Sequence, residues 1–296
     1  MRPREQRSCH VGESCAFADG PAVWPISKGQ RQRIEELRWR FTSLDAALSP
    51  HRQVEHLSEL IDLGVNALTA FTMDDRLAEP EYARAAAAGI PVVTFGSLSP
   101  SSATAIRQRV DSESCAADAA AYLAERVPKA RVLVIGGPPV PALAARTHHF
   151  MAAAARAGLR IVAREDNVGD VEETARPIAE RLLDRHPDID AIWCFNDYTA
   201  LAAAGELRRR GQPVQSGACR GVIVSGIGGF PALIEAIREG QVTFTYDSHP
   251  VETGRAAINA LEDILLRKQQ PAREVWIDFV RYEQSNVLRY VPWEDR

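Results

Sequence analysis

Two polar residues end an apolar stretch in the second half of the chain. The run 191–195 is apolar, Asn196 and Asp197 follow it directly, and the residues after them have helical spacing. An amide offers both a donor and an acceptor, which suits a hydroxyl group that is itself both. Either residue also makes a good helix N-cap. The pair therefore predicts a ligand contact, a helix cap, or both at once.

Other groupings that resemble catalytic or cofactor motifs lack the spacing that those motifs need. The segments "GIGGF" (226–230) and "GGPPVP" (136–141) do not fit the dinucleotide fingerprint with its later acidic residue. His148 and His149 are adjacent on an expected helix, so their side chains diverge and cannot chelate together. No nucleophile elbow and no Walker lysine occur. The sequence predicts neither an enzyme nor a bound cofactor.

The cysteines predict neither a disulfide scaffold nor a metal centre. There are five, an odd number at irregular spacing, so at least one thiol stays outside any internal bridge. Cys9, His10 and Cys15 have no second ligand pair at zinc spacing, and we expect no metal site. Cys194 lies in an apolar run and is expected in the core.

Composition limits the classes of protein that the chain can be. Its 296 residues suffice for two domains, with 46% apolar and 25% charged residues. A net charge of -4 gives no basic surface for nucleic acid, so no nucleic-acid partner is expected. No window has the roughly 18 to 20 apolar residues of a membrane span. The N-terminal stretch begins with arginines, as a signal peptide does, but no apolar run of about 7 to 15 residues follows them, so the sequence itself predicts no export signal.

Helical and strand patterns alternate from residue 26 onward. Roughly ten short apolar strands alternate with helices of about 10 to 15 residues, which predicts an α/β fold of parallel sheets covered on both faces. Ten strands are too many for one sheet of about six, so we expect two sheets. The serine-rich stretch 96–110 is the expected crossover between lobes. Several strands end in small or polar residues, and two such edges would form a cleft that closes on a small molecule.

Six segments of the chain form a recognisable set: "FADGPAVWPISKGQRQRIEEL", "HRQVEHLSELIDLGVNALTAF", "YARAAAAGIPVVTF", "ARTHHFMAAA", "HPDIDAIWCFNDYTALAAAGEL" and "ETGRAAINALEDILL". Together they resemble the type I periplasmic binding proteins, the ribose-binding-protein-like solute receptors, with LacI-type effector domains as relatives. The resemblance implies two similar lobes, each a parallel sheet flanked by helices, joined by three hinge crossovers. The N-terminal lobe is expected to be 8–110 plus 249–276, and the C-terminal lobe 111–248 plus 277–296.

The resemblance also implies roles for individual residues. Asn196, with Asp197, matches the family's strand-end pair that bonds the ligand. Arg146 matches an arginine that reaches into the cleft. The alternative interpretation is that Arg146 is a surface arginine on a helix. Asp111 matches the acidic residue at the start of the second lobe, and its alternative is a helix N-cap.

The sequence departs from the family's sugar-binding pattern at several positions. Pro21, Ala22 and Val23 stand where stacking aromatics are usual, which leaves Trp24 or Phe17 as substitutes. Gly96 and Ser97 replace an Asp-Arg pair, and a glycine replaces a strand-end aspartate. The full expected ligand-binding set is Asp19, Trp24, Phe95, Asp111, Arg146, Asn196, Asp197, Gly228, Asp247 and Ser248.

The resemblance implies a solute receptor of an ABC importer that binds a small polar, sugar-like ligand between its lobes. Its partner would be the transporter's permease, its location periplasmic or extracellular, and its state monomeric. Two alternatives stay open: a cytoplasmic LacI-type effector-sensing domain without its DNA-binding part, and an α/β enzyme that uses the same cleft. A repressor relative should dimerise, so light scattering would separate the first alternative from the receptor.

Overall fold

The computed structural model describes residues 8–139 and 141–296. Residues 1–7 of the N-terminal stretch, on which the export-signal expectation rests, lie outside it. The chain forms two compact units. The first holds the described residues up to Arg107 together with Pro250–Ile277 and Arg296, and the second holds Gln108–His249 and Asp278–Asp295.

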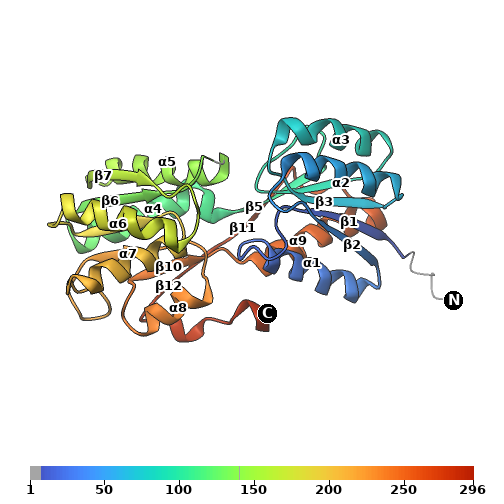
Figure 1. Ribbon diagram of the computed structural model, residues 1–296. Helices are drawn as coiled ribbons and strands as arrows, with labels where there is room; N and C mark the ends of the chain where they lie inside the picture. The colour runs from blue at the N-terminus through green and yellow to red at the C-terminus, as the bar shows by residue number, and fades with distance from the viewer. Residues whose placement is uncertain (1–7, 140) are drawn as a thin grey trace. The chain divides into compact units, whose positions relative to one another are not determined.

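The first unit contains a six-stranded sheet in the order β11-β5-β4-β3-β1-β2 (Figure 1). Its strands are β1 (His10–Cys15), β2 (Arg40–Asp45), β3 (Ala67–Phe71), β4 (Val92–Phe95), β5 (Thr104–Gln108) and β11 (Glu274–Ile277). Its helices are α1 (Trp24–Leu37), α2 (Pro50–Asp62), α3 (Asp75–Ala87) and α9 (Pro250–Glu262), which a short π-helical turn, Asp263–Arg267, extends. The pairs from β2 through β5 are parallel.

Two helical layers cover the two faces of this sheet because successive strand residues point to opposite sides. In β3, Ala67 belongs to the cluster formed with α1 and α9, whereas Leu68 belongs to the cluster formed with α2 and α3. In β4, Val93 and Val92 divide in the same way. The α/β fold class predicted from the alternating pattern is confirmed.

One carboxylate is buried in the middle of β1. Glu13 is 3% exposed and accepts hydrogen bonds from Ser27 (2.7 Å), Gln30 (2.6 Å) and Ser43 (2.7 Å). Gln30 in turn accepts from the Thr69 hydroxyl at 2.7 Å. No ion pair reaches Glu13 from residues 8–139 or 141–296. Neutral donors on α1 and β2 therefore satisfy both oxygens of this buried side chain.

We expect Glu13→Ala to lower the free energy of unfolding by about 3 kcal/mol, because the buried Ser27 and Gln30 and the half-buried Ser43 lose their acceptor. Glu13→Gln should cost about 1 kcal/mol or less, since the amide keeps one acceptor and hydroxyls can rotate to accept from its nitrogen. Urea denaturation of both variants provides the comparison. Equal losses for alanine and glutamine would contradict a hydrogen-bonding role for this side chain.

The second unit repeats the architecture with the sheet order β12-β10-β9-β8-β6-β7. Its strands are β6 (Arg131–Gly136), β7 (Arg160–Asp166), β8 (Ala191–Cys194), β9 (Ile223–Ser225), β10 (Phe244–Asp247) and β12 (Val280–Glu283). Its helices are α4 (Glu113–Arg126), α5 (Pro141–Arg156), α6 (Glu172–Arg185), α7 (Asp197–Arg209) and α8 (Pro231–Arg238). The strands pair in parallel except for β12, which runs antiparallel to β10.

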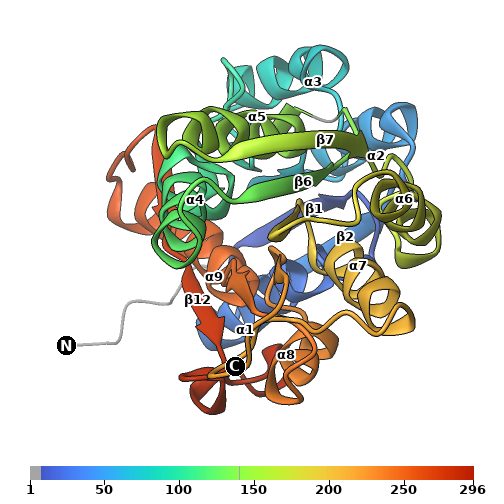
Figure 2. The same ribbon diagram turned by 90° about the vertical axis from the view of Figure 1, so that its left-hand side faces the viewer.

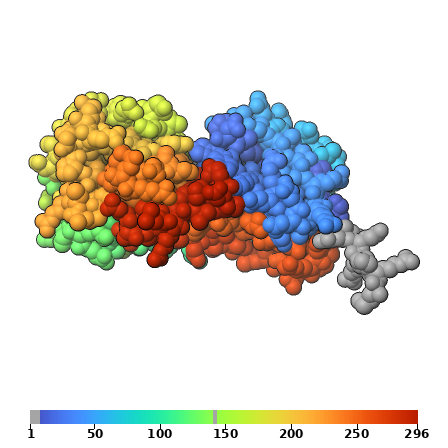
Figure 3. Space-filling view, turned by 90° about the horizontal axis from the view of Figure 1, so that it is seen from below, coloured from blue at the N-terminus to red at the C-terminus, as the bar shows by residue number. Residues whose placement is uncertain are grey.

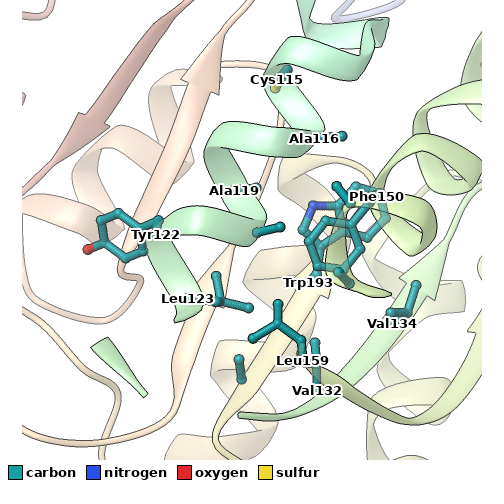
Figure 4. Packing of buried hydrophobic residues seen from close by; sticks show 14 of the residues in the cluster. Cys115, Ala116, Ala119, Tyr122, Leu123, Val132, Val134, Phe150, Leu159 and Trp193 are labelled. Atoms are coloured by element: carbon teal, nitrogen blue, oxygen red, sulfur yellow. The ribbon is translucent and has the colours of Figure 1, made fainter. Parts of the chain in front are cut away.

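Aromatic stacking fixes the face of this sheet that α4 and α5 cover. Figure 2 shows these two helices on one side of β6 and β7, and α6 and α7 on the other. Phe150 on α5 stacks on Trp193 of β8, with ring centroids 4.4 Å apart and planes 5° from parallel (Figure 4). Leu123 and Leu159 pack in the same cluster. The stack fixes α5, and therefore Arg146, against the sheet.

The C-terminal segment is anchored to the second unit. The Tyr290 hydroxyl donates to the Gly229 carbonyl at 2.9 Å, and Trp293 packs edge-on against Phe230 with centroids 5.4 Å apart. Figure 3 shows the red C-terminal residues beside the orange surface of α8. This segment thereby fixes the loop between β9 and α8.

No helix in the described part of the chain combines the length and apolar character needed to cross a membrane.

Candidate ligand-binding site

Asn196 lies where β8 ends, at the N-cap of α7. Its side-chain oxygen accepts from the backbone N–H of Thr199 at 2.9 Å, so the predicted capping role is present. Its amide nitrogen donates to Oδ1 of Asp170 at 2.6 Å. The cap fixes the amide at the carboxyl edge of the sheet. A contact between Asn196 and a ligand stays a prediction.

Arg146 is buried and ion-paired rather than a surface helix residue. Its side chain is 11% exposed, and its Nε and Nη2 both donate to Oδ1 of Asp111, at 2.9 and 2.6 Å. Its Nη1 donates to the Phe195 carbonyl at 2.6 Å, at the end of β8. Among the described residues these bonds use three of its five N–H groups, so two remain for a ligand.

Asp111 forms an ion pair with Arg146 and is not the N-cap of a helix. It ends a short 3₁₀ turn, Arg109–Asp111, and Ser112 occupies the N-cap of α4. Its carboxylate oxygen holds the guanidinium plane in place from one side. Asp111 and Arg146 are therefore brought together as the expected site requires, although their contact with a ligand stays a prediction.

Asp170 joins this cluster and is absent from the expected set. It follows β7 in an exposed loop and has a left-handed backbone, with φ at 59°. Burial of its carboxyl group by surrounding protein raises its pKa, and Arg146 and the Asn196 hydrogen bond oppose that rise. The sequence signal that could have identified Asp170 is its position shortly after a strand of the same sheet. The other polar residues of the loop make this aspartate hard to single out.

Asp197 is fully buried beside Asn196. One oxygen accepts from the Phe230 backbone N–H at 2.7 Å, and the other accepts from the Thr245 hydroxyl at 2.6 Å. Burial raises the pKa of Asp197 to about 7, although these hydrogen bonds favour its ionised form. Both oxygens are used within the unit, so the geometry gives Asp197 a structural role. As a ligand contact it stays a prediction.

Gly228, Asp247 and Ser248 lie where β9 and β10 end. Gly228 has φ at 148°, and a Cβ there would lie 2.7 Å from the Phe230 ring, so a side chain does not fit. Asp247 is fully buried and accepts from the His249 backbone at 3.0 Å. The half-buried Ser248 hydroxyl donates to the Gly228 carbonyl at 3.4 Å. Ligand contacts of these three residues stay predictions.

The expected contacts in the first unit lie at the carboxyl edge of its own sheet. Asp19 is exposed in the turn after β1, and Trp24 is the half-buried first residue of α1. Phe95 ends β4 but is only 3% exposed, within the core cluster that α1 and α9 cover. Ser97, in place of the family's charged pair, donates to Asp75 at 2.8 Å. The ligand roles of Asp19, Trp24 and Phe95 stay predictions.

Four of the five cysteines are buried like small apolar residues, whereas Cys219 is exposed. Cys194 is fully buried, and burial raises the pKa of its thiol. Burial, together with the charge of Glu13, raises the pKa of Cys15 to about 12. Throughout residues 8–139 and 141–296, no three His, Cys, Asp or Glu side chains gather as a metal site.

Comparison with known proteins defines the class. Residues 17–269 match the family described as "Periplasmic binding protein domain". The chain is 24% identical over 261 residues to the ribose import binding protein RbsB of Bacillus subtilis, covering 88% of this chain and 82% of that protein. The chain belongs to the periplasmic binding protein family.

Solved structures share the fold. A periplasmic ribose ABC transporter protein from Conexibacter woesei superposes with a TM-score of 0.85 at 18% identity, over 95% of this chain and 94% of that one. A solute-binding protein from Actinobacillus succinogenes with bound D-allose gives 0.84 at 21% identity, over 96% of this chain and 100% of that one. The family expected from the six segments is confirmed. Each of these three relatives carries the name of a binding or transport protein.

Proposed function

We propose that this chain is a solute receptor of an ABC importer that binds a small, polar, sugar-like ligand. The observation that carries the proposal is the cluster of Arg146, Asp111 and Asn196 at the carboxyl edge of the second sheet. The arginine is already oriented by Asp111 and a backbone carbonyl, so binding costs little side-chain ordering. Relatives named for ribose and D-allose support a polyhydroxylated ligand.

The receptor acts by differential affinity rather than by covalent chemistry. The bound ligand is proposed to favour the form of the receptor that the permease recognises. Periplasmic location, a monomeric state and the permease as partner belong to this proposal, and relatives named as periplasmic and import proteins support the location and the permease. Light scattering of the purified chain tests the monomer, because a dimer would favour the effector-domain alternative.

We expect Arg146→Ala to weaken sugar binding by about 100-fold, because two charge-assisted hydrogen bonds to the ligand are lost. Isothermal titration calorimetry with D-ribose, D-allose and myo-inositol measures this, after a thermal-shift screen selects the tightest. Asn196→Ala should weaken the same ligand as well. Arg156→Ala, an exposed arginine on the same helix, is the matched control and should bind like the wild type. A ligand that binds Arg146→Ala and the wild type equally would contradict the site.

A further inference from the structure

The cluster at the carboxyl edge of the second sheet has one negative charge in excess. Asp111 and Asp170 supply two carboxylates, against the single guanidinium of Arg146. That guanidinium is committed to Asp111 by two N–H groups and to the Phe195 carbonyl by a third. Within the described part of the chain, no hydrogen bond reaches Oδ2 of either carboxylate. The edge therefore offers one acceptor oxygen on each carboxylate, and one carboxylate more than its guanidinium can neutralise.

Asp170 is the carboxylate that a ligand can neutralise. It is exposed, so a solute reaches it, whereas Asp111 is 16% exposed and already paired with Arg146. Surrounding protein nevertheless disfavours the charge of Asp170 enough to raise its pKa despite the nearby arginine. Burial raises the pKa of the Tyr198 phenol, and the nearby charge of Asp170 is the next largest cause of that rise. In such surroundings a direct cation partner stabilises a carboxylate more than it does in bulk water.

A cation satisfies Asp170 better than a neutral hydroxyl does. A hydroxyl donates one hydrogen bond and leaves the excess charge in place. An ammonium group neutralises the charge and forms a charge-assisted hydrogen bond, which is roughly twice as strong as a neutral one. The two remaining N–H groups of Arg146 still serve the oxygens of hydroxyl groups. One edge can thus hold hydroxyl groups and one ammonium group of the same molecule.

We infer that the ligand is a polyhydroxylated molecule carrying an amino group, of the amino sugar class, whose ammonium binds the Asp170 carboxylate while hydroxyls bind Arg146 and Asn196. The inference rests on the proposed function, because it takes the same edge as the binding site. It gives Asp170, in the loop after β7, a role in selecting the ligand.

The test is calorimetric titration of the full chain with matched pairs of aminated and neutral molecules. The pairs are D-glucosamine with D-glucose, D-galactosamine with D-galactose, and an inosamine with myo-inositol. We expect the aminated member to bind at least about tenfold more tightly in one or more pairs. Asp170→Asn should remove that preference, so that the two members of a pair bind this variant with affinities within about threefold of each other. Asp188→Asn, which removes an exposed carboxylate between α6 and β8, should keep the preference.

The outcomes separate this inference from the proposed function. If the neutral member binds as tightly in every pair, or if Asp170→Asn keeps the preference, the amine assignment is overturned while the receptor proposal stands. If the protein is folded by circular dichroism yet binds none of these molecules and none of the sugars above, both proposals fall.

Discussion

Replacing Asp197 with alanine is expected to lower the free energy of unfolding by about 3 kcal/mol, because the buried N–H of Phe230 and the hydroxyl of Thr245 lose their acceptor. Through these bonds the carboxylate connects the start of α7 to the loop before α8 and to β10. Urea denaturation measures the loss, and hydrogen exchange should show it within residues 108–249. Asp188→Ala, at an exposed position, is the control and should change stability by less than about 0.5 kcal/mol.

The pH dependence of stability identifies the buried carboxyl group as the cause. Because burial raises the pKa of Asp197 to about 7, the folded protein holds a proton that the unfolded chain loses above about pH 4. Its contribution to stability is therefore complete below about pH 4 and is lost as the pH rises through about 7, at up to about 1.4 kcal/mol per pH unit. Asp197→Asn should lack this slope. A stability difference between wild type and Asp197→Asn that stays constant from pH 4 to 8 would contradict the assignment.

The alternating pattern predicts most of the fold, and it misses strands whose hydrogen-bond partners lie far along the chain. The expected helices of about 10 to 15 residues are present, as in α4, whose 14 residues span Glu113–Arg126. Strand β1 is hidden from the apolar pattern because it carries Glu13 and other polar residues, whose partners come from α1 and β2. The serine-rich stretch 96–110 contains strand β5, which the pattern did not indicate, as well as the change from the first unit to the second between Arg107 and Gln108. Long-range hydrogen bonds that no local pattern encodes decide both cases.

The candidate site is predictable where one residue type at a strand end suffices. Asn196 and Arg146 lie at the carboxyl edge of the second sheet. The different roles of Asn196 and Asp197 are not predictable from their types. The two residues are adjacent at a helix start and point in different directions, so Asn196 reaches Asp170 whereas Asp197 is buried. The contact of Asp170 with Asn196 could not be predicted, because the sequence does not show which loop approaches the Asn196 amide. That approach depends on the packing of α6 against α7.

Gly29→Ala is expected to lower the free energy of unfolding by about 3 kcal/mol or more, because helices α1 and α9 pack with their backbones in direct contact. A Cβ on Gly29 would lie 1.9 Å from the carbonyl oxygen of Val251, and one on Gly254 would lie 1.9 Å from that of Ile26. Backbone atoms inside two packed helices cannot move aside as a flexible side chain can, so the helices must separate and lose core contacts. Thermal and urea denaturation measure the effect.

Gly205→Ala provides the matched control for this glycine effect. Gly205 lies within α7, and a Cβ there would meet no atom within 4 Å. Alanine at that position should stabilise the protein by about 0.5 to 1 kcal/mol, because it costs less backbone entropy in a helix. Opposite signs for the two substitutions would attribute the loss at Gly29 to steric overlap, since helix propensity favours alanine at both positions. A Gly29→Ala variant as stable as the wild type would show that α1 and α9 pack less closely than the structure has them.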